Sequence, residues 1–329
     1  MVEKYDNFHT PLWLLVITST MLLSIGTFHN INAETNSTSI VEDAVVDPNK
    51  GYLVEPVKDD IYRIINGEQY QIMFVTTGEG VIVVDAPPSI GENIFKAISE
   101  ITDEPITHLI YSHSHKDHIG AAGMFPNNIT IIAHDETYQN LVQRNDSDRP
   151  IPTETFSNNY TLQAGDKTLE LSYYGPIHQR GNIFVYEPDQ KVLMLVDHVH
   201  PGWIPWTHLA VTEDVPAYIQ GYDKILDYDF DVFVPGHGNI ANRDHIILQK
   251  EYIDDLVNNT NSALQAINFT DVTKDIDPPN EYLMIKTYFD AVSQHCADLT
   301  DNEWRDKLKG SDIWTDTLCF RVALSLGVD

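Results

Sequence analysis

Short apolar runs alternate with polar breaks over most of the chain, a pattern that is typical of β-strands joined by turns. Ile61–Ile65, Gln71–Thr76 and Val81–Asp85 are interpreted as consecutive strands, because Asn66-Gly67 and Gly78-Glu79-Gly80 between them are turn sequences. Further strands are expected at His108–Tyr111, Ile129–Ala133, Tyr160–Leu162, Thr168–Tyr174, Asn182–Tyr186, Lys191–Val196 and Asp231–Val234. The strands therefore fall into two β-rich halves.

Apolar residues at helical spacing separate and follow these halves. The expected helices are Ile90–Ile101, His118–Phe125, Asp135–Gln143, Val215–Tyr228, Ile246–Ile267, Glu281–Ala297 and Asp312–Leu326. Beyond Asn242 the pattern predicts helices alone. Two β-rich halves, each followed by helices, predict an α/β (α+β) fold in which two sheets pack face to face with helices outside.

The N-terminal segment is read separately from the fold. Residues 11–28 read PLWLLVITSTMLLSIGTF without a charge, and Ala33 ends a sequence that suits cleavage. This predicts a signal peptide or, at nearly the length that spans a bilayer, a membrane anchor. Both alternatives export the remainder of the chain, as a secreted or membrane-anchored protein. The expected divisions are 1–33 for the signal peptide or anchor, 34–51 for a linker, 52–270 for a β-rich domain and 271–329 for a C-terminal helical extension.

Charge and cysteine content narrow the classes of partner and site. The chain has 20 basic and 49 acidic residues, a formal charge of -29, which repels phosphate backbones and argues against nucleic acid as a partner. Cys296 and Cys319 form no CxxC pair, so a thiolate zinc knuckle is excluded. The two could form a disulfide or remain buried thiols, and export favours the disulfide.

The densest chemistry is the run Ser112-His113-Ser114-His115-Lys116-Asp117-His118, which follows an expected strand and opens an expected helix. Imidazoles at alternate positions of such a loop can point to one side and share one ion. The turn that follows brings Asp117 and His118 towards a second ion. Imidazole nitrogen and carboxylate oxygen are suitable ligands for zinc. The motif therefore predicts a site for two divalent metal ions.

This motif resembles that of the metallo-β-lactamase superfamily, and the resemblance runs from about residue 52 to residue 242. It implies an αββα sandwich with a metal site at one edge, followed here by the C-terminal helical extension, and residues 52–270 as the metallo-β-lactamase domain. The segments that also match the family are Asp85 at the end of VIVVD, Gly175-Pro176-Ile177-His178 with Gly181-Asn182-Ile183, Leu195-Val196-Asp197, and Val234-Pro235-Gly236-His237-Gly238.

The resemblance implies a division of ligands between the two metals. One metal would be held by His113, His115 and His178, and the other by Asp117, His118 and His237. Asp197 would bridge them, although His198 and His200 follow closely and either could take its place. Zinc is the expected metal, with iron or manganese as alternatives. Water shared by two such ions ionises near neutral pH, and Asp117 or Asp197 would orient the resulting hydroxide.

The substrate is expected to be a small carbonyl compound, a lactone or a (thio)ester. Aspartate at position 197 resembles lactonases and thioesterases of the glyoxalase II type rather than classical exported β-lactamases. Lactonases of the acyl-homoserine class have tyrosine where this chain has His200, whose imidazole could contact a substrate carbonyl. Trp203 and Trp206 could line an apolar wall of the substrate site or pack beneath the loop as core.

Two other functions stay open on the sequence alone. A β-lactamase would cleave an amide with the same site, and a non-catalytic scaffold would bind metal without turnover. The complete set of ligands argues against the scaffold. The C-terminal helices could cap the site, form a homodimer surface or cover the sandwich.

Overall fold

The computed structural model describes residues 41–276 and 280–328. The predicted signal peptide or anchor lies outside these residues. Among the helices that the structure describes, none combines the length and the apolar character needed to cross a membrane.

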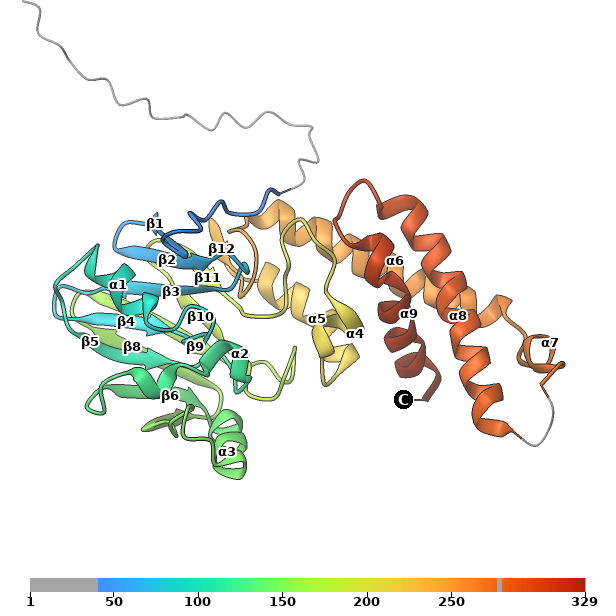
Figure 1. Ribbon diagram of the computed structural model, residues 1–329, viewed down its shortest axis with the longest axis horizontal. Helices are drawn as coiled ribbons and strands as arrows, with labels where there is room; N and C mark the ends of the chain where they lie inside the picture. The colour runs from blue at the N-terminus through green and yellow to red at the C-terminus, as the bar shows by residue number, and fades with distance from the viewer. Residues whose placement is uncertain (1–40, 277–279, 329) are drawn as a thin grey trace, which may run out of the picture. The chain divides into compact units, whose positions relative to one another are not determined.

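The first sheet is built by the N-terminal half (Figure 1). Its strands lie in chain order: β1 (Tyr52–Lys58), β2 (Ile61–Asn66), β3 (Gln71–Thr76), β4 (Val81–Val84), β5 (Ile106–Ile110), β6 (Thr130–His134) and β7 (Glu154–Phe156). β1 to β4 pair antiparallel, and β4 to β7 pair parallel. The helices of this half are α1 (Asn93–Ser99), α2 (Lys116–Ile119), the 3₁₀ turn η1 (Ala122–Met124) and α3 (Asp135–Arg144).

The second sheet follows the order β12-β11-β10-β9-β8. Its strands are β8 (Asn159–Ala164), β9 (Lys167–Ser172), β10 (Phe184–Glu187), β11 (Val192–Met194) and β12 (Val232–Val234). The helices after it are α4 (Thr207–Val211), α5 (Val215–Leu226), α6 (Arg243–Ala266), α7 (Phe269–Thr273), α8 (Glu281–Trp304) and α9 (Ser311–Val328). α8 runs beside both α6 and α9 (Figure 1).

Side-chain alternation explains why both faces of the first sheet are buried. In β3, Ile72 and Phe74 pack against α1, whereas Met73 and Val75 face the second sheet. The second sheet in turn buries its other face against α5, α6, α8 and α9. The layers are therefore helix, sheet, sheet and helix. The predicted αββα sandwich with C-terminal helices is confirmed.

Several elements differ from the prediction. The expected helix His118–Phe125 is split into α2 and η1, and β1, β7, α4 and α7 were not predicted. β7 has three residues, too few to show a period. The sequence of β1, YLVEPVK, contains a proline, which is tolerated there because β1 is an edge strand.

α4 is a left-handed turn. His208, Leu209 and Ala210 have φ values of 55°, 57° and 53°, and Val211 has φ 52°. None is glycine, so the conformation is unfavourable for each of these residues in isolation.

The last two helices are covalently joined. Cys296 of α8 and Cys319 of α9 form a disulfide, so of the two alternatives left by the sequence the bonded one is present. The boundary expected at residue 270 stays a prediction.

Candidate metal centre

The strand ends of the first sheet place the histidine-rich loop. β4 ends at Val84, one residue earlier than predicted, and Asp85 turns the chain with φ 69°. The buried Asp85 carboxylate accepts hydrogen bonds from Ser112 N at 2.8 Å and Ser112 Oγ at 2.6 Å. Ser112 Oγ also lies 2.9 Å from His113 Nδ1. This chain of contacts leaves His113 Nε2 facing the centre of the site.

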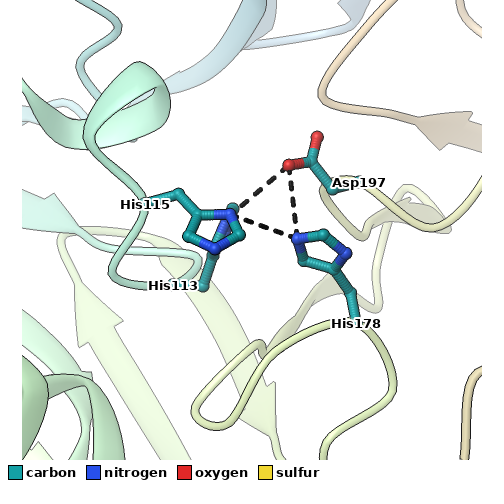
Figure 2. A group of neighbouring side chains, drawn as sticks. All are labelled: His113, His115, His178 and Asp197. Atoms are coloured by element: carbon teal, nitrogen blue, oxygen red, sulfur yellow. Dashed lines mark hydrogen bonds and ion pairs between the residues drawn. The ribbon is translucent and has the colours of Figure 1, made fainter. Parts of the chain in front are cut away.

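The first group consists of three histidines and one aspartate (Figure 2). Its members are His113, His115, His178 and Asp197, each offering a ligand atom within 4.8 Å of the others. His178 Nε2 lies 3.3 Å from His115 Nδ1, and Asp197 Oδ2 lies 3.6 Å from His113 Nε2 and 3.5 Å from His178 Nε2. Such a group fits a divalent ion of tetrahedral preference.

The second group adjoins the first. It consists of Asp117, His118, Asp197 and His237, again with ligand atoms within 4.8 Å of one another. Asp197 Oδ1 lies 3.0 Å from His118 Nε2 and 3.1 Å from His237 Nε2. The two oxygens of Asp197 therefore face different groups, Oδ2 the first and Oδ1 the second. His198 points elsewhere, since its buried ring packs on Tyr218 and Tyr222.

The His237 loop reaches the centre through a close backbone approach. A β-carbon on Gly236 would stand 2.6 Å from Val196 Cγ1 and 3.1 Å from both Asp197 Oδ1 and His118 Cε1. Only glycine leaves room for the carboxylate at this position. The loop is tied to the first sheet, because Gln71 N donates to Gly236 O at 3.0 Å.

Protonation in the metal-free protein differs between the two groups. Burial lowers the pKa of His113 well below its usual range and that of His178 to about 3, so both imidazoles are neutral at pH 7. Burial opposes charge on His118 as well, but the Asp197 carboxylate outweighs it and raises the pKa of His118 to about 9. Burial raises the pKa of Asp85 to about 6 against the opposing effect of His118 and Ser112.

An unpartnered nitrogen shows that the residues present fit a metal ion. Within the described residues, His113 Nε2 is buried without a hydrogen-bond partner and faces the first group of ligand atoms. Buried polar atoms in folded proteins nearly always have a partner. A bound cation would satisfy this nitrogen.

Other side chains at the site were not found from the sequence. Tyr70 donates from its hydroxyl to Asp117 Oδ2 at 3.2 Å, and its ring lies 4.3 Å from that of His237. Burial, followed by the charge of Asp117, raises the pKa of Tyr70 to about 12. Gln179 Oε1 accepts from Ser114 Oγ at 2.9 Å and so holds the loop between two histidines. No pattern around Tyr70 or Gln179 marks them in advance, because their roles depend on neighbours distant in sequence.

A cavity of about 640 Å³ opens beside both groups. Its lining contains His115, Asp117, Asp197 and His237, together with His200 and the partly exposed Trp203 and Trp206. His200 is buried, lies outside both ligand groups, and has its ring stacked 6.2 Å from that of His237. The predicted ligands thus come together, and the predicted substrate contacts line one cavity beside them. Their roles stay predictions.

The sequence matches one family over its central part. Residues 65–237 match the family model of the Metallo-beta-lactamase superfamily, which is more than half of the chain. The chain belongs to the metallo-β-lactamase superfamily. The match extends from β2 to the His237 loop, so it includes both ligand groups.

Curated relatives within this superfamily carry several activities. The chain is 30% identical over 189 residues to 2,4-dinitroanisole O-demethylase subunit alpha of Nocardioides sp. (strain JS1661), covering 56% of each protein. It is 27% identical over 155 residues to a type 2 metallo-β-lactamase of Elizabethkingia meningoseptica, covering 43% of this chain and 59% of that protein. The chain therefore spans less than two thirds of these relatives.

A solved structure extends the likeness of fold into the C-terminal helices. A stereoselective inverting sec-alkylsulfatase from Pseudomonas sp. superposes with a TM-score of 0.63 at 16% identity, over 84% of this chain and 50% of that one. At this identity the likeness shows the fold alone. Superfamily membership and the two ligand groups together make the chain a metallo-hydrolase superfamily protein with a site that could hold metal.

Proposed function

We propose that this protein is a hydrolase that holds two divalent metal ions, with zinc the expected metal. The observation that carries the proposal is the position of Asp197, whose two carboxylate oxygens face separate groups of histidines. His113, His115 and His178 would hold one ion, and Asp117, His118 and His237 the other. Asp197 would bridge them.

The bound ions would supply a water of lowered pKa and a Lewis acid for the substrate carbonyl. The chain's own residues would orient the reacting groups. Asp117 can accept a proton at its carboxylate, and the Tyr70 hydroxyl can hold that carboxylate in place from 3.2 Å. Burial lowers the pKa of His200 to about 4, so this imidazole is neutral and can contact a substrate carbonyl.

The favoured substrate is a lactone or (thio)ester. Trp203 and Trp206 line the cavity beside the candidate ligands and offer an apolar surface for the acyl part. A β-lactam amide is an alternative, in keeping with the name of one relative. An aryl ether is a further candidate, because the name of another relative describes the demethylation of a dinitroanisole and because tryptophans suit an aromatic ring.

Elemental analysis and a substrate panel test the proposal. Purified protein should contain two metal ions per chain and hydrolyse at least one of an alkyl lactone, a thioester, a cephalosporin and 2,4-dinitroanisole. His115→Ala should lose most bound metal and nearly all turnover. His295→Ala, a histidine of α8 outside both ligand groups, should retain both. A folded protein with two bound ions and no turnover on any of these compounds would favour the non-catalytic scaffold.

Export is part of the proposal. A disulfide between Cys296 and Cys319 is typical of proteins in an oxidising compartment. Detection of the protein outside the cytoplasm, with the N-terminal sequence of the purified protein, would distinguish a cleaved signal peptide from a retained anchor.

A further inference from the structure

A third tryptophan, from the C-terminal helices, lines the cavity. Trp314 of α9 lies in the lining with Trp203 and Trp206, and its exposed fraction of 36% resembles their 37% and 45%. Partly exposed tryptophans at a cavity wall leave apolar area that a ligand can cover. Trp314 lies beyond the part of the chain that matches the superfamily.

The C-terminal segment is also hydrogen-bonded to the backbone on both sides of Trp203. Ahead of α9, Lys309 N donates to Gly202 O at 2.9 Å, and Lys309 O accepts from Ile204 N at 3.0 Å. These bonds pair the residues on either side of Trp203 with the start of α9. Gln249 of α6 adds a third tie, donating from Nε2 to Trp203 O at 2.7 Å.

A second contact lies at the other end of the segment that begins at Gly202 and carries Trp203 and Trp206. Arg321 of α9 donates from Nη2 to the carbonyls of Thr212 and Glu213, each at 3.3 Å. The left-handed turn α4 lies between the two contacts, and the rings of His208 and Phe320 are 6.3 Å apart. α9 and the residues just before it therefore anchor the wall of the cavity at both of its ends.

The charges of this wall point to the chemistry of the group it would bind. Asp43, Glu68 and Asp117 line the cavity, and no lysine or arginine does so among the residues that the structure describes. The nearby Lys309 ammonium lies 3.5 Å from the Asp43 carboxylate and 5.1 Å from the centre of the Trp203 ring. A carboxylate or sulfate on the remote part of a substrate would therefore find no free cation there, and Glu68 would repel it.

We propose that the cavity takes substrates whose remote part is apolar and uncharged, and that Trp314 determines this preference together with Trp203 and Trp206. Glu68 disfavours substrates that carry an anion on that part. The inference rests on the proposed function in that the reacting carbonyl would lie at the ligand groups. It predicts selection by charge and by apolar area, which binding can measure without turnover.

A matched pair of fluorescent probes tests the binding of the apolar part directly. N-Phenyl-1-naphthylamine is neutral, and 1-anilinonaphthalene-8-sulfonate has the same ring skeleton with one sulfonate. We expect the neutral probe to bind the metal-loaded protein at least about tenfold more tightly than the sulfonate. Equal affinity for the two probes, or tighter binding of the sulfonate, would overturn the proposal that the cavity prefers an uncharged group.

Paired variants locate the binding in the proposed cavity. Trp314→Ala should weaken the neutral probe at least about fivefold, and Trp314→Phe should restore most of the affinity. Ile313→Ala, at an exposed neighbour on α9 outside the lining, should leave it unchanged. An unchanged affinity in Trp314→Ala would remove Trp314 from the site, and an equal loss in Ile313→Ala would indicate a disturbed helix instead.

A matched pair of variants tests whether the charge of Glu68 causes the preference for the neutral probe. Glu68→Lys should reduce the preference for the neutral probe several-fold. Glu79→Lys makes the same change of net charge at an exposed turn outside the lining and should leave the preference as it was. Equal effects of the two variants would assign the selectivity to net charge and overturn the role of Glu68. If the substrate panel shows no turnover while these binding results hold, the proposed function fails and the binding assignment stands.

Discussion

At the residue scale, the candidate metal centre is packed too closely to admit an added side chain at Gly236. In Gly236→Ala the new methyl would meet Val196, Asp197 and His118 at 2.6 to 3.1 Å. Because Asp197 would have to move, we expect a loss of about 10- to 100-fold in metal affinity, measured by titration with a chelating competitor. Gly67→Ala is the control, since a β-carbon there meets nothing within 4 Å. Normal affinity in Gly236→Ala would contradict this geometry.

His118 should couple metal binding to pH. Its pKa of about 9 means that the metal-free protein carries an imidazolium at neutral pH, and that proton must leave before Nε2 can bind a metal. Affinity at the second group should therefore rise about tenfold per pH unit up to pH 9 and then level off. Calorimetry in buffers of different ionisation enthalpy should detect about one proton released. Affinity independent of pH between 6 and 9 would refute this.

The sequence identifies the candidate ligands better than it identifies their supports. The run from Ser112 to His118 and the glycine-flanked His237 are visible because their chemistry is dense over a few positions. Tyr70 and Trp314 reach the site only through folding and carry no local pattern. Asp197 illustrates the limit, because only the family resemblance implied that it would bridge the two groups, and no local pattern around it does so.

At the element scale, the strands were the elements most readily predicted, because buried strands are short apolar runs between turn sequences. β3 was predicted with its observed bounds. Its sequence, QIMFVT, contains a short apolar run, and turn sequences flank it on both sides. The left-handed turn α4 could not be predicted. Its sequence, THLAV, contains no glycine that would mark a left-handed backbone, and the turn packs against α9, far along the chain.

The end of β10 carries a buried acid that should make stability depend on pH. Glu187 is 0% exposed, and burial raises its pKa. The folded state therefore holds this proton more tightly than the unfolded state, in which the pKa is about 4.3. The contribution of Glu187 to the free energy of unfolding should be most favourable at low pH. It should fall as the pH rises through the raised pKa.

Glu187→Gln removes this dependence while keeping an acceptor for Gln190 N, which donates to Glu187 Oε2 at 2.7 Å. We expect the variant to be more stable than the parent at pH 7.5, with a smaller difference at pH 4.5. Urea unfolding at both pH values measures this. A difference that does not change with pH would contradict the assignment.

At the scale of the whole molecule, the disulfide stabilises helices that supply none of the candidate ligands. It closes a segment of 23 residues between α8 and α9. Replacing both cysteines by alanine should lower the free energy of unfolding by about 3 kcal/mol. Metal content should remain two ions per chain, because the ligand groups lie in other elements. Urea unfolding and elemental analysis check the two parts.

Reduced parent protein supplies the control. Its stability should fall to that of the double variant, whereas the oxidised parent should remain higher. If the double variant is as stable as the oxidised parent, the bond contributes nothing to the folded chain. If it loses metal, the C-terminal helices support the ligand groups more directly than their positions indicate.

The turn α4 has a consequence for how such a protein can diversify. Four successive residues without glycine hold a left-handed backbone that costs about 1–2 kcal/mol each in isolation. Arg321 and Phe320 of α9, about 110 positions later in the chain, contact the two ends of this turn at Thr212 and His208. Substitutions in that distant helix can therefore reshape the mouth of the site. Evolution towards new ligands can proceed there while the histidines of the two candidate ligand groups remain as they are.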